Sequence, residues 1–230
     1  MKQKKYFIIY GLCLSILVLF VGGFYVYKTI NDSSDIDKTA VKKDAYYSIR
    51  NNATSLQKTL YEDLINSLES DVKDDKNTYE LLAQNYVADF YTWTNKFRRN
   101  DVGGIQFVDE DIRTNVYQAA QNQTYNDLYY YLENGGLKNT LEVSEVTVTD
   151  SKYIDYFIID SEGEEEIYDE VIERYVYGDY HDAYAVSLRW TYKETESFNT
   201  NVYEKDAQVI MMMNKDNIPM IVEVNHEKTH

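Results

Sequence analysis

The chain has 230 residues, enough for one folded domain and an anchor, and its 39 Asp and Glu residues outnumber its 23 Lys and Arg residues, giving a formal charge of -16. This acidity repels nucleic acid and anionic lipid headgroups, so nucleic acid is not an expected partner. The single cysteine, Cys13, lies in a hydrophobic segment near the N-terminus, so the rest of the chain has no disulfide to stabilise it and needs a packed core.

A transmembrane helix is predicted at residues 6–27, which form a run without a charged side chain. As a helix this run is about 33 Å long, enough to cross a bilayer core of roughly 30 Å. Lys2, Lys4 and Lys5 precede it and favour a cytoplasmic tail at residues 1–5, with the C-terminal domain outside the cell membrane. A cleaved secretory signal is the alternative, but it needs a shorter apolar core followed by small residues.

Residues 28–53 are polar, mixed in charge and weakly periodic, and we interpret them as a juxtamembrane linker that becomes helical toward its end. The extracytoplasmic domain is expected at residues 54–230. Its first helix is predicted from Thr54 to about Val72, with Thr54 and Gln57 as a capping box and a leucine at every fourth position from Leu56 to Leu68. That narrow leucine row packs either against one neighbouring element or against a second copy of the chain.

The second helix is predicted to begin with the cap pair Asn77 and Glu80. It presents a continuous aromatic and apolar face, formed by Leu82, Tyr86, Phe90, Trp93 and Phe97. Residues 98–108 contain Gly103 and Gly104 and are expected to form a loop before Asp109 caps a third helix. That helix, or a broken successor to it, is expected to stop at residues 134–136.

Beyond Gly136 the apolar residues alternate, which is typical of strands. Strands are predicted at residues 141–148, 153–159, 167–177, 183–193, 203–214 and 219–225, with breaks at Gly163, at Gly178–Asp179 and at residues 215–217. Helices followed by antiparallel strands predict an α+β domain in which helices pack on a curved sheet.

This order of elements resembles the cystatin-like or nuclear transport factor two-like roll. The resemblance is carried by the aromatic helix from Glu80 to Phe97, the loop to Asp109, the helix ending at Gly135–Gly136 and the strands to Val224. It also resembles the bitopic subunits of bacterial conjugation and type IV secretion machines, which have a short cytoplasmic tail, one membrane helix and such a roll outside. The resemblance implies an assembly factor, although one fold hosts many functions.

Candidate binding residues are few, and the sequence predicts no catalytic, cofactor or metal site. A pocket between helix and sheet is expected, if one exists, around four rings, Tyr86, Phe90, Trp93 and Trp190. The basic pair Arg98–Arg99 either docks an acidic partner or complements the dipole at the end of a helix. The acidic tract at residues 160–170 lacks the spacing of a calcium loop and is interpreted as a solvated turn, and the three histidines lack metal-ligand spacing.

These observations favour a non-catalytic, membrane-anchored interaction domain that belongs to a bacterial envelope, secretion or conjugation complex. The expected partners are the membrane, through residues 6–27, other envelope proteins and a second copy of the chain. Two alternatives remain open. One is a sensor ectodomain that binds a small ligand, and the other is a roll enzyme that uses Tyr or Asp for acid-base chemistry.

Overall fold

The computed structural model describes residues 41–226, except 45, 73, 99, 134–139, 171 and 196–198. The predicted membrane helix at residues 6–27 and the cytoplasmic tail lie outside these residues. Within the described ranges, no helix is both long and apolar enough to cross a membrane. The chain divides into two compact units, of which the second, Asp44–Tyr47 with Ala53–His230, contains the α+β domain.

The described part of the first unit is a small hairpin. Its strands are β1 (Val41–Lys43) and β2 (Ser48–Arg50), which pair antiparallel with Val41 opposite Arg50. The helical ending predicted for the linker is therefore wrong, because these residues satisfy their backbone hydrogen bonds with each other across the hairpin.

Two helices, α2 (Ser55–Glu69) and α3 (Asp75–Phe90), pack against each other. The capping box predicted for α2 is confirmed: Thr54 Oγ1 accepts the backbone N–H of Gln57, and Gln57 Oε1 accepts that of Thr54. The start of α3 differs from the prediction. Asp74 is the N-cap and accepts the N–H of Asn77, so Asn77 belongs to the first turn.

The predicted aromatic face of α3 is only partly helical. The helix ends at Phe90, and Trp93 is buried in the segment that follows, whereas Phe97 is 42% exposed. Asp89 at the end of α3 holds the segment that follows. Lys96 Nζ lies 2.6 Å from Asp89 Oδ1, and Asp89 Oδ2 accepts the N–H of Gly104 at 2.7 Å. The chain therefore turns back at Gly104, whose φ of 72° favours glycine.

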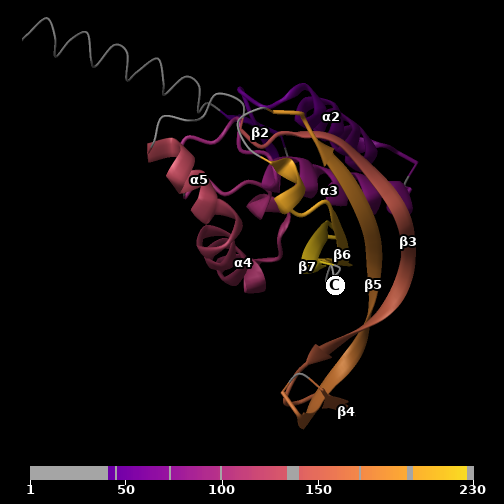
Figure 1. Cartoon of the computed structure of the whole chain (residues 1–230). Helices are drawn as coiled ribbons and strands as arrows, with labels where there is room; N and C mark the ends of the chain where they lie inside the picture. Colours follow the sequence, from indigo (N-terminus) through magenta and orange to yellow (C-terminus); the bar gives the residue numbers. More distant parts are fainter. Residues whose placement is uncertain are drawn as a thin grey trace, which may run out of the picture. The chain divides into compact units, whose positions relative to one another are not determined.

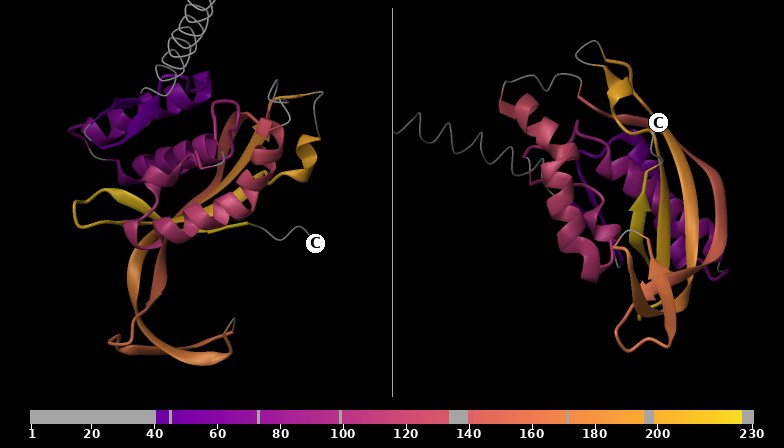
Figure 2. Two further views of the ribbon diagram at one scale, coloured as in Figure 1. Left: turned by 90° about the vertical axis from the view of Figure 1, so that its left-hand side faces the viewer. Right: turned by 60° about the horizontal axis from the view of Figure 1, so that its bottom comes forward.

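After the short 3-10 helix η1 (Ile105–Phe107), Asp109 caps α4 (Glu110–Asn122) as predicted. The chain bends at Gln123 and continues as α5 (Thr124–Glu133), which confirms the broken successor. The two helices lie on the β7 side of the sheet, away from β3 (Figures 1 and 2).

The sheet is antiparallel and curved, with the strand order β3-β5-β6-β7, and β4 pairs with the first part of β5. Its strands are β3 (Val143–Ile159), β4 (Glu165–Asp169), β5 (Arg174–Tyr192), β6 (Asp206–Met213) and β7 (Pro219–Asn225). A second 3-10 helix, η2 (Thr200–Val202), precedes β6, which begins at Asp206 and not at residue 203 as predicted. The α+β prediction is confirmed, with helices packed on a curved antiparallel sheet.

The core lies between the helices and one face of the sheet. Alternate residues of β5, from Tyr184 to Trp190, point toward α3, and the ring of Tyr184 stacks on Tyr79 with centroids 4.7 Å apart. Similarly, Trp190 stacks on Tyr91 at 4.5 Å. On the opposite face a smaller apolar cluster, Ala183, Ala185 and Ile210, is covered by partly buried side chains of β3, β6 and β7.

Candidate interaction surface

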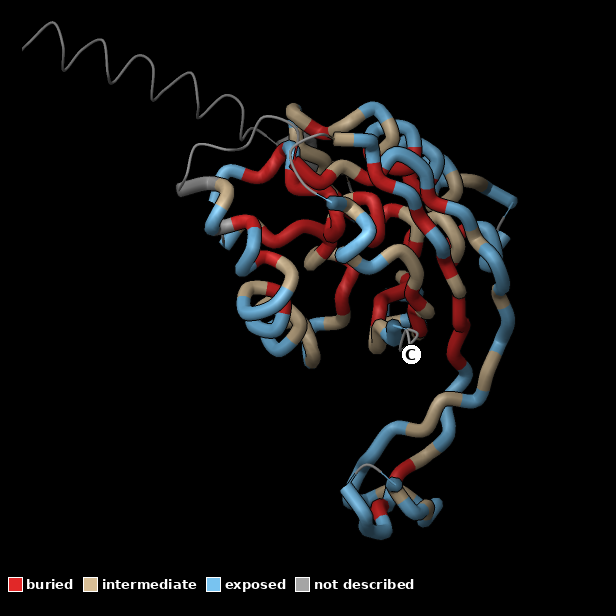
Figure 3. Tube along the Cα trace, in the orientation of Figure 1, coloured by how far each residue is buried: buried red, intermediate tan, exposed pale blue. Residues whose placement is uncertain are grey.

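Two strands extend far beyond the helices and form an arm, which we define as residues 150–182. It comprises the end of β3, all of β4 and the beginning of β5, and it stands away from the helical layer in both views (Figures 1 and 2). The last ring contact with α3 is the stack of Tyr79 on Tyr184. Most of the chain in the arm is exposed (Figure 3).

The arm presents large aromatic and aliphatic side chains to solvent. Tyr153 is 64% exposed, Tyr175 66% and Ile159 57%, and the other exposed members are Ile158, Tyr168, Ile172, Tyr177 and Tyr180. Several of them are arranged in edge-to-face pairs across the strands: Phe157 with Tyr180, and Tyr168 with Tyr175, each with centroids 5.2 Å apart. Exposed rings concentrated on one projecting segment are typical of a protein-binding surface rather than of scattered surface residues.

The same segment holds most of the net negative charge of the chain. Residues 150–182 contain twelve Asp and Glu residues, with Lys152 and Arg174 as the only cations, which gives a formal charge of -10 out of the total of -16. Because the arm is narrow and exposed, this charge produces a negative potential around the aromatic side chains. The arm therefore combines exposed apolar side chains with a high density of negative charge.

Some of these carboxylates also shape the arm. Asp160, Asp169 and Asp179 accept backbone N–H groups of Glu162, Ile172 and Glu164 at 3.0 to 3.2 Å and so stabilise the turns on either side of β4. Elsewhere on the arm, a hydrogen bond from Tyr177 to Glu166 raises the pKa of the Tyr177 hydroxyl. In the described part of the chain, no three acidic, His or Cys side chains converge as ligands for a metal ion.

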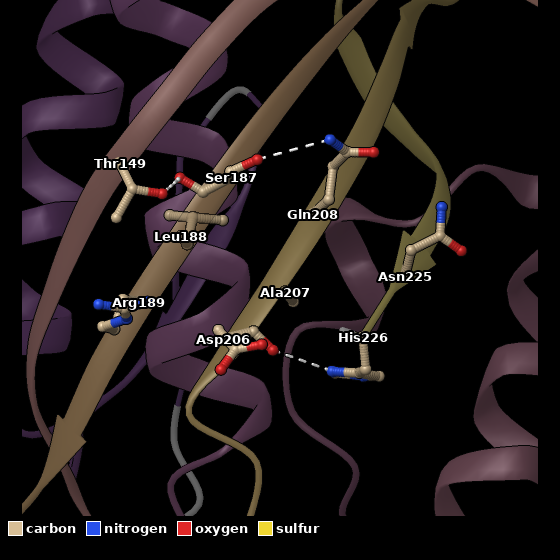
Figure 4. Close-up of a pocket in the computed structure, with 9 residues that line it drawn as sticks. All are labelled: Thr149, Ser187, Leu188, Arg189, Asp206, Ala207, Gln208, Asn225 and His226. Carbon is tan, nitrogen blue, oxygen red and sulfur yellow. Dashed lines mark hydrogen bonds between the residues drawn. The ribbon is translucent and has the colours of Figure 1, made fainter. Parts of the chain in front are cut away.

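A hollow of about 200 Å³ lies on the sheet face opposite α3 (Figure 4). Figure 4 shows α3 behind the strands and the following lining residues in front of it: Thr149, Ser187, Leu188, Arg189, Asp206, Ala207, Gln208, Asn225 and His226. His226 bridges two elements, since its Nδ1 lies 3.1 Å from the backbone oxygen of Asp206 and its Nε2 lies 3.1 Å from the hydroxyl of Tyr91. Charged and amide side chains line the hollow together with the apolar Leu188 and Ala207.

The four rings predicted to surround a pocket are all buried in the core. Tyr86 stacks on Phe90 at 5.2 Å, Trp190 stacks on Tyr91, and Trp93 meets Tyr203 edge to face at 5.2 Å. Burial raises the pKa of Tyr86, so its hydroxyl stays neutral and is a poor base at physiological pH. These rings fill the helix-sheet interface with their own contacts, and the hollow around His226 lies on the other side of the sheet.

Of the predicted partner contacts, Arg98 is exposed, and Arg99 lies outside the described residues. Since α3 ends at Phe90, Arg98 does not belong to the last turn of that helix, as the dipole interpretation had assumed. Its backbone oxygen accepts the N–H of Asp101 within the loop. The alternative, in which Arg98 contacts an acidic partner, stays a prediction.

No protein-family model, curated protein or solved structure matches this chain.

The arm is the feature that the sequence did not predict. The sequence indicated two separate strands, an acidic turn and alternating tyrosines in this region. Because the predicted strands were interrupted between residues 148 and 153 and at Gly178, the length of the arm was not predicted. Asp150 and Lys152 interrupt the apolar alternation on β3, and a register shift between Val148 and Asp150 moves the even-numbered side chains of the strand to the other face of the sheet. On β5 the alternation does continue, since Val176 precedes Tyr184 at an even number of positions.

Proposed function

We propose that this protein is a membrane-anchored, extracytoplasmic interaction domain that acts as a non-catalytic component of a bacterial envelope assembly, such as a secretion or conjugation complex. The uncharged run at residues 6–27 supplies the anchor, and the basic cluster before it holds the N-terminus in the cytoplasm. The domain carries the function outside the membrane.

The observation that carries this proposal is the arm. The arm keeps two long strands paired outside the core and exposes aromatic rings, which forgoes the stabilisation that burial of apolar surface provides. Exposed tyrosines cost little conformational entropy when a partner covers them, because their side chains have only two rotatable bonds. Such a segment supports binding to another protein rather than chemistry on a small substrate.

Affinity capture from gently solubilised native membranes tests the proposal. The full chain is compared with a version lacking residues 1–28 and with a version in which Tyr153, Tyr175 and Tyr180 are replaced by serine. We expect the full chain to recover envelope proteins that the arm variant does not recover. Equal recovery by the arm variant would contradict a role for the arm, and equal recovery by the anchorless chain would contradict assembly at the membrane.

A second candidate function, a small-ligand-binding ectodomain, is favoured by the hollow around His226. Arg189, Asp206 and Gln208 supply a cation, an anion and an amide to the same concave surface. A thermal-shift screen of the full chain in detergent with small polar metabolites tests this candidate. A melting temperature raised in the wild type but not in His226→Ala would support it, and an unchanged melting temperature across the screen would count against it.

A further inference from the structure

The outer edge of β3 changes character along its length. Near the helices it is covered by α3 and the segment after it. Gln84 Nε2 donates to the backbone oxygen of Val146 at 3.1 Å, and the Ser151 hydroxyl donates to Glu80 at 2.6 Å. Val143 N–H likewise donates to the Thr92 hydroxyl at 3.1 Å. Beyond Ser151, no strand among the described residues pairs with this edge.

The direction of the free backbone groups follows from the register. Asp160 N–H donates to the oxygen of Tyr177 at 2.9 Å, and Ile159 lies opposite Gly178. Hydrogen-bonded pairs alternate with non-bonded pairs in an antiparallel ladder, and the register from Asp150 to Ile159 is continuous. Residues at odd positions therefore turn their backbone N–H and C=O groups outward, and these residues are Tyr153, Asp155, Phe157 and Ile159.

The same odd-numbered residues place their side chains on one face of the arm. They share the face of Tyr184, because Tyr153 is its cross-strand partner. Tyr153 and Ile159 are more than half exposed, and Phe157 contacts Tyr180. An additional strand on this edge would gain main-chain hydrogen bonds and, at every second residue, a position beside an exposed ring.

We propose that the end of β3, Lys152–Ile159, accepts an extended, positively charged segment of a partner protein as an added β-strand. This inference rests on the proposed function and names the chemistry of the partner. Exposed edge strands are templates for pairing with another chain, and strand addition obtains affinity from the main chain and specificity from alternate side chains. The -10 charge of the arm selects a cationic segment.

The same charge argues against a second copy of this chain as the occupant. Pairing two β3 edges would bring together two arms that each carry a formal charge of -10. Like charges at strand separations of about 5 Å repel strongly unless they are screened. Lysine or arginine at the solvent-facing positions of a partner strand would instead approach the carboxylates of the arm.

The test uses the full chain in nanodiscs and a fluorescent peptide of about ten residues in which lysine alternates with valine or threonine. The matched control peptide has glutamate in place of each lysine. Fluorescence anisotropy measures both affinities. We expect the lysine peptide to bind and the glutamate peptide not to bind, whereas no binding of the lysine peptide would overturn the inference.

Substitutions at Asp155 separate strand addition from simple attraction of charges. Asp155→Pro removes an outward N–H and places a ring on the free edge without removing a β3–β5 hydrogen bond. Asp155→Ala removes the same carboxylate but keeps the N–H. We expect Asp155→Pro to weaken binding by at least about tenfold and Asp155→Ala by less than about threefold. Equal affinities for the two variants would overturn strand addition.

Amide exchange of the wild type, measured by NMR, gives a second readout that does not depend on the folding of the proline variant. Peptide binding should slow exchange at Tyr153, Asp155 and Phe157 while leaving Ile154 and Tyr156, which already pair with β5, unchanged. Unchanged exchange at the three odd positions would contradict the inference. Capture of the same envelope partner by wild type and Asp155→Pro would also refute strand addition while leaving the proposed function intact, whereas a wild type that captures no partner would refute the proposed function itself.

Discussion

Tyr125 connects three parts of the chain through one buried hydroxyl. The hydroxyl donates to the backbone oxygen of Phe90 at 2.8 Å and accepts the N–H of Gly103 at 2.9 Å, so it ties α5 to the end of α3 and to the glycine loop. Tyr125→Phe leaves both backbone groups buried without this partner. We expect a loss of roughly 2 to 4 kcal/mol in the free energy of unfolding, measured by chemical denaturation.

Tyr117→Phe is the matched control for that change. The Tyr117 hydroxyl donates to the oxygen of Asn100 at 3.0 Å, but this bond lies at the surface, where water can replace the missing group. The control should cost less than about 1 kcal/mol. A similar loss in the two variants would show that burial of the Tyr125 hydroxyl does not determine its contribution.

The buried tyrosines predict unfolding at alkaline pH. Burial raises the pKa of Tyr79 to about 12 and also raises the pKa values of Tyr86, Tyr91 and Tyr125 well above their ordinary value, whereas the unfolded chain titrates near 10. Above pH 10 the unfolded state has lost protons that the folded state keeps, so stability is complete below pH 10 and falls as pH rises. By pH 12 each fully buried tyrosine costs roughly 2 to 3 kcal/mol.

Absorbance at 295 nm and circular dichroism, recorded together during an alkaline titration, check this prediction. The buried hydroxyls should ionise in the same cooperative step in which the secondary structure is lost. Complete tyrosine ionisation near pH 10 with intact secondary structure would contradict the burial that the fold assigns to these rings.

Lys96 shows what a single sequence does not reveal about individual residues. It lies near the basic residues Arg98 and Arg99 in a stretch predicted as the end of a helix and a loop, yet its side chain is fully buried against Asp89. The pairing depends on the return of the chain at Gly103, where a Cβ would overlap the backbone oxygen of Asp89. The local sequence pattern does not predict that the glycine loop comes back to contact Asp89.

At the scale of elements, Gly178 determines whether the arm can form. It sits inside β5, where an added Cβ would overlap the oxygen of Ile158 and lie 2.7 Å from the ring of Phe157. The loop before β4 also passes close to Gly178 at Gly163. We expect Gly178→Val to unpair the arm although valine favours strands elsewhere.

Hydrogen exchange with mass spectrometry measures this effect by region. Residues 152–182 should exchange faster in Gly178→Val, while α3 and β6 keep wild-type protection, because the core between helices and sheet is unaffected. Tyr177→Val, at the neighbouring exposed position, should leave the arm protected. Loss of protection throughout the domain in Gly178→Val would mean that the arm and the core form one cooperative unit.

Elements defined by local chemistry were predictable from the sequence. The capping box of Thr54 and Gln57 and the cap at Asp109 involve residues within three positions of each other, so the pattern alone identifies them. The turn around Asn217, with a φ of 56°, was found for the same reason. The strand boundaries were not predictable, because pairing of β3 with β5 keeps Asp150 and Lys152 extended although their side chains are polar.

The candidate site likewise has features that the local sequence predicts and features that depend on tertiary packing. The sequence indicated aromatic rings on a helix and on a strand, and Tyr86, Phe90, Trp93 and Trp190 are indeed buried together with other rings in the core. It did not distinguish rings that fill a core from rings that face solvent. That distinction depends on where α3 stops covering the sheet, which is a property of the packed domain.

At the scale of the whole molecule, the distribution of charge bears more directly on the proposed partner binding than the total charge does. The arm holds a formal charge of -10, and the other residues together hold -6. The arm also carries the exposed rings. Electrostatic attraction would therefore bring a cationic partner to the same surface that offers the apolar contacts. We therefore propose the arm as the surface through which this domain binds its partner.

Photo-crosslinking in living cells tests that claim most directly. A photoreactive phenylalanine analogue replaces Tyr175 on the arm in one variant and Tyr130 on α5 in another, two positions that are 66% and 65% exposed. We predict a discrete crosslinked partner from position 175 and none of that size from position 130. Crosslinking of the same partner at position 130 but not at position 175 would contradict the account.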